Sequence, residues 1–177
     1  MDLSTFFRSV PDPRRAQGRR YPLECMLWMS FLSIASGYTS YRQIGNFCAI
    51  RKDFFMNYFG IAAVPSYVSF RTIFTILNNQ VFLEKFKEQY LLSVESGDFI
   101  ASDGQTLRAT VANSQSSSQD FCSLVSFYCQ QTGLTVAMAS YLNQKDHEGE
   151  VFRNLLDNLR NKGVIFTLDA LHTQKKQ

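Results

Sequence analysis

Residues 164–170, VIFTLDA, form an apolar run that ends on a single carboxylate, Asp169. A continuous apolar run is typical of a central strand that is covered on both faces. The segment before it, residues 148–163, reads EGEVFRNLLDNLRNKG and repeats its apolar residues at helical spacing up to Gly163. A helix that leads into a central strand predicts a parallel strand pair joined by a right-handed crossover.

Three short runs rich in β-forming residues precede this helix, and turn signals separate them. They are DFIASDG at 98–104, CSLVSFYCQQ at 122–131 and LTVAMASYLN at 134–143. The predicted order over residues 97–177 is therefore strand, strand, strand, helix, strand. This order predicts an α/β domain in which the last strand is parallel to a neighbouring strand.

The first half of the chain has a helical period instead. Apolar residues recur at helical spacing in five segments, which are residues 2–10, 23–36, 40–60, 64–79 and 80–96. The segment 40–60 reads as two short helices that end at Gly60, a residue type typical of helix C-caps. We therefore expect an α+β protein with an all-helical domain at 1–96 and an α/β domain at 97–177. No pair of helices identifies itself as a helix-turn-helix.

The net charge of +3 is uneven along the chain. The excess of basic residues lies before residue 99, and four arginines fall within the segment RRAQGRR: Arg14, Arg15, Arg19 and Arg20. Arginine forms bidentate hydrogen bonds with phosphate, so this cluster predicts a contact with DNA. A solvated charged loop is the alternative interpretation.

The composition is typical of a folded protein and gives no sign of a membrane span. With 45% hydrophobic and 19% charged residues the chain has the material for a folded core. The apolar stretch at 23–38 contains Glu24 and three serines and is too short to span a membrane. The four cysteines match no zinc or redox spacing, which favours reduced residues in a cytoplasmic protein.

Two carboxylates close predicted strands. Asp103 follows FIAS and Asp169 follows IFTL, so parallel neighbours would bring both to the same edge of the sheet. Two carboxylates at close range repel each other, and a divalent cation makes their approach favourable. The alternative is that Asp103-Gly104 forms a hairpin turn or that each aspartate caps a helix.

Several motifs in this order resemble the insertion-sequence transposases of the H-repeat-associated type. They are VPDPRR at 10–15, VPSYVSFRTIFTILN at 64–78, IASDGQTLR at 100–108, NQKDHEGEVFRNLLDNL at 143–159 and VIFTLDALHTQK at 164–175. In that family a helical associated domain precedes a ribonuclease-H-like DDE catalytic domain. The resemblance therefore implies DNA cleavage and strand transfer at transposon ends.

The resemblance also assigns residues. Asp103 matches the first catalytic aspartate and Asp169 the second, in a motif that continues with Gln174 and Lys175. Each aspartate is implied to be a ligand of Mg²⁺ or Mn²⁺ in a two-metal site. Lys145 and Glu148 fit the segment before the family's next helix, and Arg14 with Arg15 fit its D-P-R-R motif.

Departures from the family pattern modify this expectation. Gln105 stands where the family has Lys, Ala109 where it usually has Gly, and KDHEG replaces KSNEI. The third acidic ligand of the family follows the second aspartate at a distance that extends past Gln177. We therefore expect a truncated ribonuclease-H-like domain, a chain inactive alone, and a homo-oligomer or mixed oligomer with a full-length transposase. The alternatives are a regulatory fragment that binds DNA or such a transposase, and a vestigial product without function.

Overall fold

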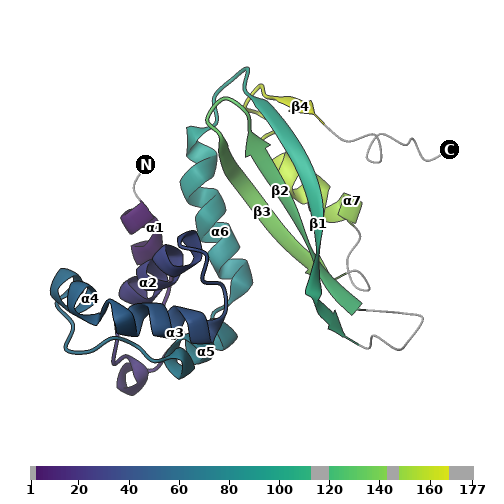
Figure 1. Ribbon diagram of the computed structural model, residues 1–177. Coiled ribbons are helices and arrows are strands. Elements are labelled where there is room, and N and C mark those ends of the chain that lie inside the picture. The colour runs from purple at the N-terminus through teal and green to yellow at the C-terminus, as the bar shows by residue number, and fades with distance from the viewer. Residues whose placement is uncertain (1–2, 113–119, 143–147, 168–177) are drawn as a thin grey trace. The chain divides into compact units, whose positions relative to one another are not determined.

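The computed structural model describes residues 3–112, 120–142 and 148–167 (Figure 1). The chain divides into two compact units, residues 1–82 and 83–177. The domain boundary expected between residues 96 and 97 stays a prediction.

Unit 1 is helical, as the period of its apolar residues predicts. Its helices are α1 (Leu3–Ser9), α2 (Leu23–Ala35), α3 (Tyr41–Ile50), α4 (Lys52–Phe59) and α5 (Tyr67–Ile76), and a short 3₁₀ turn η1 (Ala16–Gly18) lies in the arginine-rich loop. Helix α6 (Asn79–Tyr90) begins in unit 1 and continues into unit 2, where the 3₁₀ turn η2 (Leu91–Ser93) follows it. Figure 1 shows the order of these elements along the chain.

Local chemistry explains where several helices begin and end. The Ser40 side chain accepts a hydrogen bond from the Gln43 backbone N–H, and the Gln43 side chain accepts one from the Ser40 N–H, which forms a capping box at the start of α3. Gly60 ends α4 in the left-handed conformation, with φ of 64°, as its predicted role as a C-cap requires.

The core of unit 1 is built from aromatic and sulfur-containing side chains. Its fully buried members include Met26, Met29, Phe55, Phe70 and Ile73. Helix α3 comes so close to α5 that a Cβ atom on Gly45 would lie 2.8 Å from the backbone nitrogen of Tyr67. Glycine at this position therefore permits the packing of the two helices.

Unit 2 contains a four-stranded mixed sheet with the order β3-β2-β1-β4. The strands are β1 (Phe99–Ala112), β2 (Asp120–Cys129), β3 (Leu134–Leu142) and β4 (Ile165–Thr167), and helix α7 (Glu148–Asp157) precedes β4. Strand β2 is antiparallel to both β1 and β3, whereas β4 is parallel to β1. The predicted fold class and strand order are confirmed, and they fit a partial ribonuclease-H-like sheet.

Helix α7 packs against one face of this sheet. The buried cluster there contains Ile100 of β1, Phe127 of β2, Ala137 of β3, and Leu155 and Leu159 from α7 and the turn after it. The ring of Phe127 meets Phe152 of α7 and Phe166 of β4 in edge-to-face geometry, with centroids 5.4 Å apart in both pairs. This cluster ties β4 and α7 to the centre of the sheet.

The prediction that Asp103 closes its strand is wrong. Strand β1 continues past it, since Asp103 pairs with Ser126, Gly104 with Val125, and the antiparallel ladder extends to Leu107 and Cys122. The Asp103-Gly104 turn is excluded for the same reason. Pairing with β2 holds both residues in the extended strand, and this tertiary pairing outweighs their local preference for a turn.

Candidate functional site

Asp103 lies near the middle of β1 with its side chain on the exposed face of the strand. Ile100 and Ser102 are buried on the face that α7 covers. Side chains alternate along a strand, so Asp103 points to the opposite face, and it is exposed there. Ser126, its partner on β2, donates a hydrogen bond from Oγ to the backbone oxygen of Asp103 at 3.4 Å. The carboxylate is therefore accessible to a ligand from solvent.

The parallel ladder between β1 and β4 runs toward Asp103. Phe99 pairs with Ile165, Ile100 with Phe166 and Ala101 with Thr167. The first and fourth strands are therefore parallel neighbours, the arrangement in which the sequence expects both aspartates at one edge of the sheet. Asp169, the second predicted ligand, lies outside the described residues, as do Lys145, Gln174 and Lys175.

The remaining positions from the transposase motifs are spread over unit 2. Gln105 is an exposed residue of β1, two residues past Asp103, so both belong to the same face of the strand. Glu148 is the first residue of α7. Within residues 3–112, 120–142 and 148–167, no group of three or more His, Cys, Asp and Glu side chains is arranged to hold a metal ion.

In the arginine-rich loop, residues 11–22, the Arg14 side chain bonds to other residues of the same loop. The Arg14 guanidinium donates to both carboxylate oxygens of Asp12, at 2.9 and 2.8 Å, and to the backbone oxygen of Tyr21 at 2.7 Å. Its side chain is only 10% exposed. The hydrogen bond from Arg14 is the main cause that lowers the pKa of Asp12 below its usual value, against the opposing effect of burial.

The other three arginines of the loop are exposed. Arg19 donates from Nε to the backbone oxygen of Arg14 at 2.9 Å and lies 3.6 Å from the Asp12 carboxylate. Arg20 lies over the ring of Tyr21, 5.4 Å from its centroid. Neither Arg15 nor Arg20 forms an ion pair with a described residue, so their charges are available to a partner.

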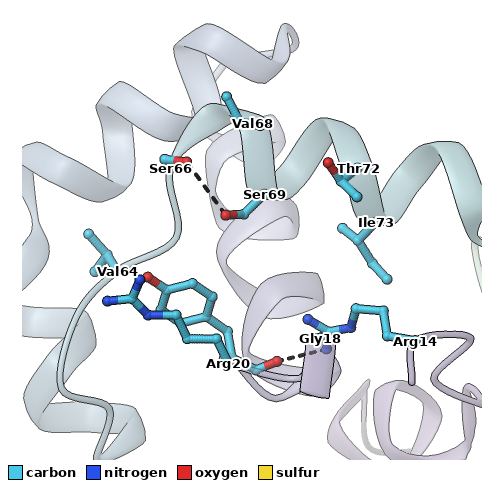
Figure 2. A pocket seen from close by; sticks show the side chains of 10 residues that line it. Arg14, Gly18, Arg20, Val64, Ser66, Val68, Ser69, Thr72 and Ile73 are labelled. Carbon is cyan, nitrogen blue, oxygen red and sulfur yellow. Dashed lines mark hydrogen bonds between the residues drawn. The ribbon is translucent and has the colours of Figure 1, made fainter. Parts of the chain in front are cut away.

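A pocket of about 360 Å³ lies between this loop and the start of α5. Figure 2 shows Arg14 and Arg20 across the pocket from Ser66 and Ser69. Thr72 adds a third hydroxyl, and none of the ten lining residues, all of them described, is acidic. Sequence reasoning missed the hydroxyls, although Ser66, Ser69 and Thr72 recur every third residue in VPSYVSFRT, a spacing that places them on one side of a helix.

None of the helices in the described ranges combines the length and hydropathy that a membrane crossing requires.

Comparison with known protein families gives a match to the helical part of the chain. Residues 4–89, which span the helices of unit 1 and nearly all of α6, match the family described as DDE_Tnp_1-associated. No curated protein matches the chain. The match covers the helical part of the chain, where the sequence predicts a transposase-associated domain. The helical region at residues 4–89 is therefore similar to the domain that is associated with DDE transposases.

Proposed function

We propose that the chain is a DNA-binding protein of the transposase type that carries part of a two-metal DDE site. In this proposal the arginine-rich loop of unit 1 contacts DNA, and Asp103 and Asp169 of unit 2 are ligands of Mg²⁺ or Mn²⁺. The DNA is a transposon end, as the resemblance to the H-repeat-associated transposases implies.

The register of β1 and β4 is the observation that carries the proposal for the metal site. The described ladder ends with Ala101 beside Thr167, and two further steps at the same register would set Asp103 beside Asp169. Directly opposed residues of neighbouring strands lie about 5 Å apart. We propose that the carboxylates of Asp103 and Asp169 hold the same ion.

The residues fit such an ion. Mg²⁺ and Mn²⁺ prefer oxygen ligands, and the Asp103 carboxylate is exposed without a hydrogen bond or ion pair to any described side chain. When bound, the metal would activate an attacking oxygen and stabilise a leaving one in phosphodiester chemistry. The role of Asp103 and Asp169 is to hold it against the DNA backbone.

We expect the chain to bind DNA, with Asp103 and Asp169 as two of the three acidic ligands that the resemblance implies. The same properties suit a regulatory role, in which the chain occupies DNA ends or joins a full-length transposase. Co-purification with such a transposase and inhibition of its activity would favour that role.

The experiment is a titration of a fluorescein-labelled DNA duplex with the purified chain at several salt concentrations. We expect the logarithm of the association constant to fall linearly with the logarithm of the salt concentration. Replacing Arg15 and Arg20 together by Gln should lower this slope by up to about two units. Replacing Arg153 and Arg160 together by Gln, which removes the same two charges at exposed positions of unit 2, is the matched control. Binding that does not depend on salt would contradict the proposal.

A further inference from the structure

We propose that the pocket between the arginine-rich loop and α5 holds a phosphodiester group of the DNA backbone. This inference rests on the DNA-binding function proposed above and deepens it, because it assigns one phosphate contact to named residues. The residues are Arg20 of the loop and Ser66, Ser69 and Thr72 of α5.

Charge is the first argument. Asp12 neutralises Arg14 through two short hydrogen bonds. Arg20 has no carboxylate partner among the described residues and lies over the ring of Tyr21. The lining of the pocket contains no acidic residue, so the Arg20 charge is left uncompensated there. An anion that enters the pocket supplies the missing negative charge.

The hydrogen-bonding groups are the second argument. Ser66 and Ser69 bond only weakly to each other, with their Oγ atoms 3.5 Å apart. Ser66 is the N-cap residue of α5, yet its side chain makes no capping hydrogen bond. One of the two O–H groups donates only across this long contact, and a phosphate oxygen is a stronger acceptor than a neutral hydroxyl, so an entering phosphate can accept from both serines.

Size and lining are the third argument. A volume of about 360 Å³ lies at the lower end of the range, about 300–1,000 Å³, of pockets that bind small molecules. Val64, Val68 and Ile73 supply apolar wall beside the polar groups. A phosphate joined to its sugar suits this mixture better than a bare ion, since the sugar carbons contact the apolar wall.

The test uses the full chain and distinguishes the effect of the Arg20 charge from that of the serine hydroxyls. Arg20→Gln should weaken binding to a labelled DNA duplex and lower the salt slope by about one unit, whereas Arg20→Lys should keep the slope. The double variant Ser66→Ala, Ser69→Ala should weaken binding about tenfold with the slope unchanged, because hydroxyls release no counterions. Arg71→Gln is the matched control, an exposed arginine of α5 outside the pocket lining.

The serine variants remove no helix cap, so α5 should stay folded, and a thermal melt checks this. Equal effects of Arg20→Gln and Arg71→Gln, together with no effect of the serine substitutions, would overturn the pocket assignment. The proposed function would still stand if the wild-type chain kept its salt-dependent binding, and would fail if the wild type showed none. A second arm adds inorganic phosphate alone. If inorganic phosphate bound saturably and stabilised the wild-type chain more than the DNA duplex stabilises it, the pocket would be a site for free phosphate. That result would overturn the assignment to DNA.

Discussion

Arg14 and Arg15 are adjacent members of the same arginine cluster, but their substitution should have different consequences. Arg14→Ala removes two hydrogen bonds to the Asp12 carboxylate and one to the Tyr21 backbone oxygen. It also leaves Asp12, whose side chain is 17% exposed, without its closest positive partner. Arg15 is exposed, and no described residue forms an ion pair with it.

The magnitude follows from these contacts. Loss of charge-assisted hydrogen bonds to a partly buried carboxylate costs about 2–3 kcal/mol, with Arg19 at 3.6 Å as partial compensation. For a unit of this size, such a loss lowers the melting temperature by roughly 10–20 °C. Arg15→Ala should change it by less than about 3 °C. Arg14→Lys should restore only part of the stability, because lysine lacks the planar fork that bonds both carboxylate oxygens.

The single tryptophan of the chain provides the assay. Trp28 lies on α2 in unit 1, with its ring edge-to-face against Phe7 at 5.1 Å, so its fluorescence reports the unfolding of this unit. Equal melting temperatures for Arg14→Ala and Arg15→Ala would refute the reasoning, because they would mean that the Asp12 pair contributes nothing to the fold.

The same pair predicts how stability depends on pH. The folded-state pKa of Asp12 lies below its unfolded value of about 3.9, so the carboxylate stabilises unit 1 above that pH. This contribution is lost as the pH falls from about 4 through the lower folded pKa. The Arg14→Ala variant should lose less stability than the wild type over this acid range. An identical acid dependence of the two melting curves would contradict the assignment.

Two further predictions concern the cores. Gly45→Ala should destabilise unit 1 by about 1–3 kcal/mol, because the added Cβ would approach the Tyr67 backbone nitrogen to 2.8 Å; Trp28 fluorescence measures this, and an unchanged melt would refute it. Phe127→Ala should destabilise unit 2 by about 3–5 kcal/mol, because its fully buried ring contacts both α7 and β4. The β-sheet signal in far-ultraviolet circular dichroism follows this loss, with the exposed Tyr128→Ala as the control, and equal melts of these two variants would count against the role of Phe127.

Regular local signals predicted most of the fold. The helical period of unit 1 and Gly60 as a C-cap each depend on residues near one another in sequence, and the structure confirms them. Residues 165–167 of the apolar run form strand β4, but β4 lies at the edge of the described sheet and Ile165 is 47% exposed, so the prediction of a central strand covered on both faces is wrong for these residues. The length of β1 could not be predicted in this way. Its passage through Asp103-Gly104 depends on pairing with β2, a contact between residues far apart in the chain.

The same distinction between local signals and long-range contacts applies to the candidate sites. The sequence identified Asp103 and the arginine cluster by residue type, but it did not distinguish Arg14, which bonds to Asp12, from Arg20, which faces a pocket. The pocket joins the loop to Ser66 and Ser69 from α5, and only the tertiary fold brings these segments together. A pattern of residue types contains little information about which distant segments contact each other in the fold.

Binding of Mn²⁺ to the full chain tests the central claim, the pairing of Asp103 with Asp169, most directly. The free-ion signal in electron paramagnetic resonance measures this binding for the wild type, Asp103→Asn, Asp169→Asn and the double variant. Asp53→Asn, a substitution of an exposed carboxylate in unit 1, is the control. We predict weak binding that either substitution at the pair abolishes and that the double variant reduces no further, because both carboxylates hold the same ion. The account would be contradicted if the Asp169→Asn variant bound Mn²⁺ as tightly as the wild type does. It would also be contradicted if the two single substitutions each lowered Mn²⁺ affinity in part and their effects added in the double variant.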